Sequence, residues 1–254
     1  MGTTLETQDA TCLMHDVKGI IFDYGGTLDS NGVHWSEVIW EGYRHAGLDS
    51  LITKEQFREA YVHAERELAS TRHITPIDDF YTLMHKKIGI ELQALRAAGH
   101  IHAADTPELN RHTAAGIAHF CDRRARECIE QARPVLEWLH ARFPLMLVSN
   151  FYGNIDSVLR AYDIRHLFKG IIESAVVGVR KPNPTLFRMA IDALELAPQQ
   201  VLVVGDSLNK DIEPAQSLGC HVLWLKGKGW TASEEALSHP CAITSITQVI
   251  DFFA

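Results

Sequence analysis

The chain lacks two features that would point to large charged or lipid partners. No run in its 254 residues approaches the roughly 18 consecutive apolar residues that a membrane-spanning helix needs. Acidic residues outnumber basic ones by 32 to 24, which gives a formal net charge of −8. A chain of this charge offers no basic face for nucleic acid. We therefore expect neither a membrane nor a nucleic acid as a partner.

Cysteine is also scarce, and its spacing argues against a disulfide framework and a zinc site. The five cysteines are Cys12, Cys121, Cys128, Cys220 and Cys241, with no C-x-x-C pair among them. An odd number without a pairing pattern is typical of reduced thiols, and no histidine is spaced to complete a zinc site. Residues 1–16 show no secretion-signal pattern and are interpreted as a frayed leader. These features predict a cytoplasmic protein.

Short apolar segments alternate with helical patterns on both sides of a long middle region. Runs rich in Val, Ile and Leu predict strands at 17–22, 145–149, 170–174, 201–205 and 221–225. Helical periodicity follows in 155–162 and 184–194. Buried strands that alternate with helices are typical of a doubly wound parallel sheet. We predict an α/β fold with a Rossmann-like core.

The middle region, 33–132, has helical rather than strand periodicity. Apolar side chains recur at helical spacing in four groups: Trp35, Ile39, Tyr43; Phe57, Tyr61, Ala64, Leu68; Phe80, Leu83, Met84, Ile88; and Ile117, Phe120, Cys121, Cys128. We predict an all-helical domain inserted into a core made of 17–32 and 133–254. A turn is expected at Asn31-Gly32, and Arg133-Pro134 predicts a helix break at the second junction.

Polar residues follow three of the predicted strands. The first strand is followed by Asp23, Gly25, Gly26 and Thr27, the second ends in Ser149-Asn150, and the fourth leads into Gly205-Asp206-Ser207, with Asp211 shortly after. Ligands bind beyond the carboxyl ends of parallel strands, so these side chains are expected to meet in one crevice. The glycines allow backbone N–H groups to approach an anion closely.

One lysine completes the set. Lys181 lies between the second and fourth of these strands, in the segment Arg180-Lys181-Pro182-Asn183-Pro184. The two prolines keep this segment out of a helix, which distinguishes the lysine from an ordinary surface one. An Asp, a hydroxyl–amide pair, a lysine and an acidic cluster thus follow one another in that order.

This order resembles the motifs of the haloacid-dehalogenase-like superfamily over nearly the whole chain. The resemblance implies that Asp23 is a nucleophile and that Lys181 neutralises the crowded anions. It also implies Mg²⁺ held by Asp23, the backbone of Gly25 and Asp206. Asp211 is a further candidate metal ligand, with anchoring of its loop or the start of a helix as the alternatives. The resemblance makes 33–132 a mobile cap that closes over the site.

The remaining candidates would contact the transferred group or the substrate. The Thr27 and Ser149 hydroxyls, the Asn150 amide and the backbone of Gly26 are expected to bind its oxygens. Trp35, next to the first junction, is interpreted as facing the substrate, with packing inside the cap as the alternative. Lys54, Lys86 and Lys87 show no distinguishing context as the cap lysine that carbon–phosphorus hydrolysis would need.

Gly25 departs from the commonest pattern of the family, in which phosphatases carry an Asp there as general acid and base. The favoured function is Mg²⁺-dependent hydrolysis of a small phosphorylated metabolite through an aspartyl-phosphate. One alternative is a metal-independent 2-haloacid dehalogenase, which also lacks that Asp. Another is a catalytically weak member that binds a phosphorylated ligand and regulates. The cluster of Asp206 and Asp211 favours the first, because dehalogenases of the family need no metal.

Overall fold

The computed structural model describes residues 14, 16–101 and 107–253. Six strands and the helices between them follow one another as β1 (Gly19–Phe22), α1 (Trp35–His45), α2 (Lys54–Ser70), α3 (Phe80–Ala97), α4 (Pro107–His140), β2 (Leu145–Ser149), α5 (Ile155–Ala161), β3 (Gly170–Glu173), α6 (Ser174–Val177), α7 (Thr185–Leu194), β4 (Val201–Gly205), η5 (Leu208–Ile212), α8 (Glu213–Ser217), β5 (His221–Leu225), α9 (Ala232–Glu235), β6 (Ala242–Ile243) and η6 (Ile246–Phe253). Single-turn helices occur at Leu48–Ser50, Arg165–Leu167 and Pro198–Gln200.

The described strands form one parallel sheet in the order β3-β2-β1-β4-β5-β6. The chain moves outward from β1 through β2 to β3, then returns to the other side of β1 with β4. β1 therefore lies at the point where the strand order reverses, which is where open α/β sheets bind ligands. The five strands predicted from the sequence are confirmed; β6, only two residues long, was not predicted.

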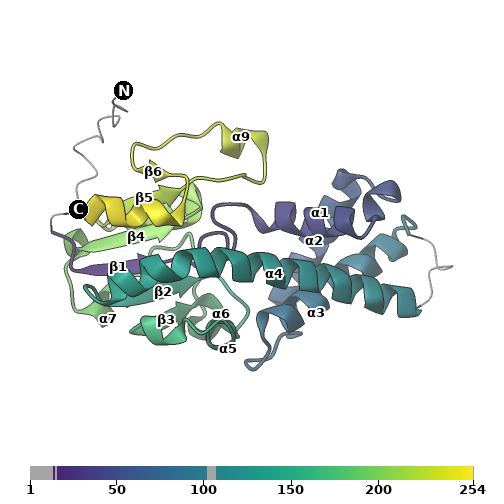
Figure 1. Cartoon of the computed structure of the whole chain (residues 1–254), viewed down its shortest axis with the longest axis horizontal. Helices are drawn as coiled ribbons and strands as arrows, with labels where there is room; N and C mark the ends of the chain where they lie inside the picture. The colour runs from purple at the N-terminus through teal and green to yellow at the C-terminus, as the bar shows by residue number, and fades with distance from the viewer. Residues whose placement is uncertain (1–13, 15, 102–106, 254) are drawn as a thin grey trace.

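Alternate side chains of the strands pack against helices on opposite faces of the sheet. Ile20 and Phe22 of β1 belong to the cluster that includes side chains of α4, α5 and η6. Ile21 belongs to a second cluster, formed mainly with α7 and the turn after β4. Figure 1 shows α4 and η6 on one side of the sheet. The result is the predicted doubly wound core, with helices on both faces.

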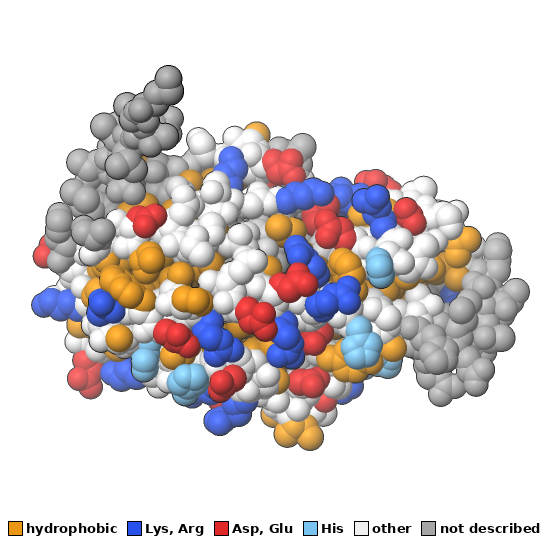
Figure 2. All heavy atoms as spheres, in the orientation of Figure 1, with side chains coloured by type: hydrophobic (Ala, Val, Ile, Leu, Met, Phe, Trp, Pro, Cys, Tyr) orange, Lys and Arg blue, Asp and Glu red, His pale blue; other side chains and the backbone are white. Residues whose placement is uncertain are grey.

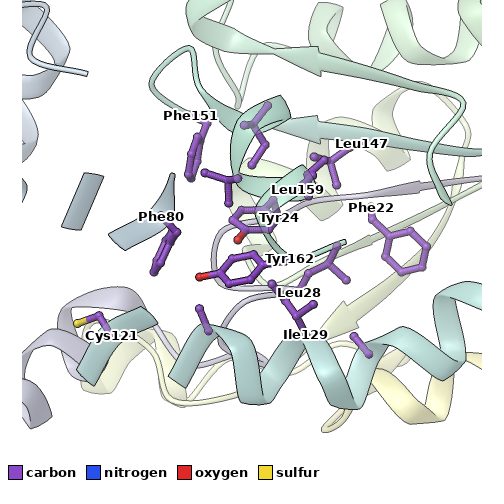
Figure 3. Packing of buried hydrophobic residues seen from close by; sticks show 14 of the residues in the cluster. Phe22, Tyr24, Leu28, Phe80, Cys121, Ile129, Leu147, Phe151, Leu159 and Tyr162 are labelled. Carbon is purple, nitrogen blue, oxygen red and sulfur yellow. The ribbon is translucent and has the colours of Figure 1, made fainter. Parts of the chain in front are cut away.

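Helices α1, α2, α3 and the first part of α4 form a helical insertion between β1 and β2 (Figure 1). The apolar groups predicted for these helices are mostly buried, with Ile39, Tyr43, Phe57 and Ile88 all at 0% exposure. Aromatic rings join this insertion to the core. In Figure 3, Phe80 of α3 lies beside Tyr162 of the core, where Tyr24 packs against Phe151.

The helix break predicted at Arg133-Pro134 is wrong, because α4 continues through Pro134 to His140. A proline inside a helix removes one backbone hydrogen bond and costs about 3 kcal/mol. Burial of Leu136 and Leu139 against the core opposes that cost. The Arg133 guanidinium also donates to the backbone oxygen of Tyr162 at 2.7 Å. A continuous helix therefore connects the insertion to the core at this junction.

The first junction is a turn, as predicted. Asn31 and Gly32 have positive φ angles of 50° and 85°. A Cβ at Gly32 would overlap the backbone of Gly227, so the loop after β5 packs directly on this turn. The N–H of His34 donates to the Lys228 carbonyl at 2.8 Å. The start of α1 is thus tied to the loop that follows β5.

The expectations about cysteines, membrane-spanning helices and charge can be compared with the described part of the chain. The free thiols predicted for Cys121, Cys128 and Cys220 are confirmed, whereas Cys241 is disulfide-bonded, so the prediction was wrong there. Among the described residues, no helix is long and apolar enough to cross a membrane. Acidic and basic side chains alternate over the face shown in Figure 2. Most of the predicted leader, 1–16, lies outside the described residues.

Candidate active site

Asp23 lies one residue beyond β1, at the point where the strand order reverses. Its N–H donates to the Val204 carbonyl at 2.9 Å, so the backbone still follows β4 there. The side chain is 3% exposed. Because β1 is buried on both faces and paired on both sides, the position of this carboxylate is set by one of the two central strands of the sheet.

Lys181 joins two of the predicted carboxylates. Its ammonium lies 2.5 Å from Asp23 Oδ1 and 2.6 Å from Asp211 Oδ1. It also donates to the Val148 carbonyl at 3.2 Å. Burial alone would lower the pKa of Lys181, but Asp211 and Asp23 raise it above its ordinary value. The lysine therefore remains a cation in contact with both acids.

Asp206 and Thr27 complete the floor of the site. The Thr27 hydroxyl lies 3.0 Å from Asp23 Oδ2 and 3.2 Å from Asp206 Oδ1, so it bridges two carboxylates. The Trp224 indole donates to the backbone oxygen of Asp206 at 2.7 Å and holds the loop after β4. Burial, together with Asp23 and Asp211, raises the pKa of Asp206 well above its usual value.

Two glycines allow these carboxylates to approach the backbone. A Cβ on Gly26, whose φ is +97°, would overlap the Asp206 carboxylate. A Cβ on Gly205 would overlap the side chain of Asp211 in the same way. Either substitution would move an acid away from the cluster.

The donor set fits a hard divalent cation. Asp23, Asp206 and Asp211 each offer one carboxylate oxygen, and these oxygens lie within 4.8 Å of one another. Lys181 compensates only one of the three negative charges. Oxygen-rich sites with excess negative charge favour Mg²⁺ over softer metals. The backbone of Gly25 lines the same cavity.

The hydroxyl and amide after β2 have different surroundings. Ser149 is buried at the end of β2 and lines the cavity. Asn150 also lines it, but its amide is engaged by the backbone of Lys181, which it contacts through Nδ2 at 3.0 Å and Oδ1 at 2.9 Å. This geometry makes Asn150 a positioning residue for Lys181. Its predicted contact with substrate oxygens stays a prediction.

These groups open into a cavity of about 600 Å³ between the core and the helical insertion. The insertion contributes an apolar wall whose residues include Trp35, Val62, Phe80, Leu83 and Met84. Trp35 also packs on the Phe80 ring, with centroids 5.0 Å apart. Trp35 thus lines the cavity and also packs within the insertion, and its predicted contact with the substrate stays a prediction.

Sequence reasoning missed a buried ion pair in the same cavity. Lys87 of α3 contacts the carboxylate of Glu65 of α2, and its side chain is 4% exposed. Its ammonium lies 4.1 Å from the centre of the Tyr61 ring. Nothing in the spacing of these residues distinguishes them from the charged face of a solvated helix. Only the packing of α2 against α3 reveals them.

Asp29 is a further acidic residue that the structure places at the cavity. It is 1% exposed, lines the cavity, and accepts a hydrogen bond from Gly26 N–H at 2.8 Å. Burial raises the pKa of Asp29 to about 8. His34, which also lines the cavity, differs, because burial lowers its pKa to about 4. At neutral pH Asp29 therefore holds a proton, whereas His34 is uncharged.

Several curated phosphatases are similar in sequence to parts of this chain. The chain is 32% identical over 125 residues to a phosphoserine phosphatase of Thermus thermophilus. The matched segment covers 48% of this chain and 49% of that protein. It is 41% identical over 216 residues to a glyceraldehyde 3-phosphate phosphatase of Methanopyrus kandleri, which covers 80% of this chain and 81% of the relative. The chain spans about half the length, or less, of the first curated relatives it matches.

Structural and family comparisons agree on the fold. A 2-haloacid dehalogenase of Pseudomonas syringae superposes with a TM-score of 0.51 and 21% identity, covering 93% of this chain and 98% of that one. At this identity the likeness shows the fold alone, which phosphatases and dehalogenases share. The family model described as haloacid dehalogenase-like hydrolase matches residues 17–219. The chain therefore belongs to the haloacid-dehalogenase-like hydrolases.

Proposed function

We propose that this hydrolase is a Mg²⁺-dependent phosphatase of small phosphorylated metabolites, with Asp23 as its nucleophile. The observation that carries the proposal is the charge of the site: three carboxylates lie together at the carboxyl end of β1, and the Lys181 ammonium contacts two of them, Asp23 and Asp211. Such a site is incomplete without a further cation. Dianionic phosphate also needs that cation in order to approach a carboxylate nucleophile.

Asp23, Asp206 and the Gly25 carbonyl are the proposed ligands of the metal. Bound Mg²⁺ would neutralise charge on the phosphoryl oxygens and hold them beside the nucleophile. Asp211 is assigned to Lys181, because its Oδ1 contacts the ammonium at 2.6 Å and its Oδ2 accepts from Ser207 N–H at 3.0 Å. The fit of this donor set supports the metal assignment.

Asp23, Lys181 and Ser149 have separate roles in the proposed reaction. The Asp23 carboxylate attacks phosphorus, the bond from phosphorus to the leaving oxygen breaks, and an aspartyl-phosphate forms on Asp23. Lys181 keeps the carboxylate in place and contributes positive charge to the phosphoryl group. Water later attacks the phosphoryl group, which releases phosphate and restores the carboxylate. The Ser149 hydroxyl is proposed to bind a phosphoryl oxygen.

The dehalogenase alternative rests on Gly25 and on the shared fold. It would use the same carboxylate to displace halide from a 2-haloacid, without a metal. The third acid of the cluster, Asp206, which Lys181 does not contact, argues against it, because such an acid suits a metal site. The phosphatase activities of the two curated relatives described above favour phosphate as the group transferred.

Activity of the full chain on phosphate monoesters and on 2-chloropropionate tests this choice. We expect phosphate release that needs Mg²⁺ and stops with chelator. Asp23→Asn should lower turnover by at least about 10³-fold, because it removes the nucleophile. Asp192→Asn, an exposed position on α7, is the matched control and should leave the rate unchanged. Chloride release that persists in chelator would contradict the proposal and favour the dehalogenase. Binding of phosphate esters without turnover would favour the regulatory alternative.

A further inference from the structure

The part of the cavity contributed by the helical insertion is mostly apolar. Its lining residues are His34, Trp35, Tyr61, Val62, Glu65, Phe80, Leu83, Met84 and Lys87. Lys87, the one cation of this set, is almost fully enclosed by its partners. Glu65 is different, because 35% of its side chain remains exposed. It is therefore the charged group that this wall offers to a ligand.

Side chains from two other elements hold the Glu65 carboxylate in place. Lys87 of α3 forms an ion pair with Oε1. The Tyr152 hydroxyl, from the core loop after β2, donates to Oε1 at 3.1 Å and lies 3.2 Å from Oε2. Burial by itself would raise the pKa of Glu65, but Lys87 and Tyr152 lower it below its ordinary value. A carboxylate fixed in this way has no freedom to turn away from a ligand.

An ionised carboxylate only accepts hydrogen bonds, which determines what can lie against it. Its lone pairs outnumber the two donors that it already contacts, so the exposed part can accept one more hydrogen. Lys87 cancels its charge, so the ligand need not be a cation. A ligand carboxylate would instead bring two acceptors together in a partly desolvated cavity, at a considerable cost in free energy.

From this geometry we infer that Glu65 is a specificity-determining residue that selects leaving groups carrying a hydrogen-bond donor and rejects those that end in a carboxylate. The inference rests on the proposed phosphatase function and names its substrate class: a phosphate monoester whose apolar body ends in a hydroxyl or amino group. The phosphoryl group would lie at Asp23 and Lys181, with the donor at Glu65. Lys87 and Tyr152 are positioning residues for that carboxylate.

Equilibrium binding to the Asp23→Asn protein tests the inference without turnover. The probes are inorganic phosphate and four matched series of phosphate monoesters, with chains of two to four carbons that end in hydroxyl, amino, methyl or carboxylate. Titration calorimetry with Mg²⁺ gives each dissociation constant. At the best chain length, we expect the hydroxyl or amino ester to bind at least about tenfold more tightly than the methyl ester, the effect of one hydrogen bond to a charged group. The carboxylate ester should bind most weakly.

Substitutions of the pair then assign the preference to Glu65. Glu65→Gln keeps the size and adds a donor, so the carboxylate ester should gain about tenfold. The double variant Glu65→Met with Lys87→Met leaves no buried charge unpaired, and in it the preference for a donor over methyl should vanish. Glu59→Gln, exposed on the same helix, is the control. In every variant inorganic phosphate should bind as before.

The possible outcomes separate the two proposals. If the hydroxyl ester binds more tightly than the amino ester, a neutral donor is the natural partner of Glu65; the reverse order identifies an amine. Phosphate binding with equal affinities across the four series, or with a preference that survives the double variant, would overturn the role of Glu65 alone. Failure of inorganic phosphate to bind to the wild type in the presence of Mg²⁺ would overturn the phosphatase proposal, and this inference with it.

Discussion

The backbone at Gly25 has room for the acid that this site lacks. A Cβ built on Gly25 meets no described atom within 4 Å, and its φ lies outside the positive range. Gly26 beside it has a φ of +97° and no room for a side chain, because of Asp206. Gly25 also lines the cavity. We therefore expect Gly25→Asp to fold without strain and to place a carboxyl group beside the leaving oxygen.

The size of the effect should depend on the leaving group. A positioned general acid contributes roughly 10²–10⁴-fold when the departing oxygen must take up a proton. Gly25→Asp should thus raise kcat/KM for an alkyl phosphate by about 10²-fold, the lower end of that range. A p-nitrophenolate leaves without a proton, so p-nitrophenyl phosphate should change little. Steady-state kinetics on the two esters measures the ratio, with Gly25→Ala as the control for the added Cβ. Gly26→Ala should abolish activity on both.

One result would refute the reasoning. If the wild type already cleaves alkyl and aryl phosphates equally fast, and Gly25→Asp leaves that ratio unchanged, the site already has an acid. The structure separates the two nearby candidates, because at pH 7 Asp29 is protonated whereas His34 is not. Asp29→Asn should then slow the alkyl ester selectively, whereas His34→Gln should not.

The remaining predictions concern the metal and the interior of the helical insertion. Asp206→Ala should raise the Mg²⁺ concentration needed for half-maximal rate more than Asp211→Ala does, and the opposite order in a Mg²⁺ titration would reverse the two assignments. Burial raises the pKa of Glu91, at 0% exposure, from 4.5 to about 7. The folded state therefore binds an extra proton between these values, and stability falls as pH rises through them, by about 3 kcal/mol. Urea unfolding at pH 5 and pH 8 should show this loss in the wild type and a smaller one in Glu91→Gln; parallel profiles would contradict the assignment.

Much of the core could be predicted from the sequence, because its signals are local. Residues 201–205 and 221–225 are continuous apolar runs, and they match β4 and β5 residue for residue. β6 has no such run. It consists of two residues, Ala242–Ile243, which pair with Trp224 and Leu225 at the edge of the sheet, and a strand this short leaves no apolar pattern in the sequence. At Pro134 a local signal was present, but it led to a wrong prediction. Its local tendency to end a helix is outweighed by the burial of neighbouring turns of α4, which depends on tertiary packing.

The residues of the candidate site likewise differ in whether local sequence signals reveal them. Asp23, Asp206 and Lys181 could be found from the sequence, since the two acids follow recognisable strands and the lysine directly precedes Pro182 in a segment with two prolines. Glu65 and Lys87 could not, because a Glu and a Lys on amphipathic helices are ordinarily solvated. Their importance comes from Tyr152, which is 87 residues from Glu65 along the chain and contacts it from the core. Such a contact leaves no trace in local spacing.

The contacts of Lys181 limit which carboxylate oxygens are available to bind a metal. Its ammonium contacts Asp23 and Asp211, and the second oxygen of Asp211 accepts from the backbone N–H of Ser207. Both oxygens of Asp211 are therefore engaged. Among the described residues, the Asp206 carboxylate accepts only from the hydroxyl of Thr27, which it shares with Asp23. Its pKa is raised well above the usual value by burial and by its acidic neighbours. A divalent cation held by Asp23 and Asp206 would relieve that repulsion and would compete only with the Thr27 hydroxyl, because Lys181 contacts the other oxygen of Asp23. A cation placed at Asp211 would have to displace Lys181 or the Ser207 N–H.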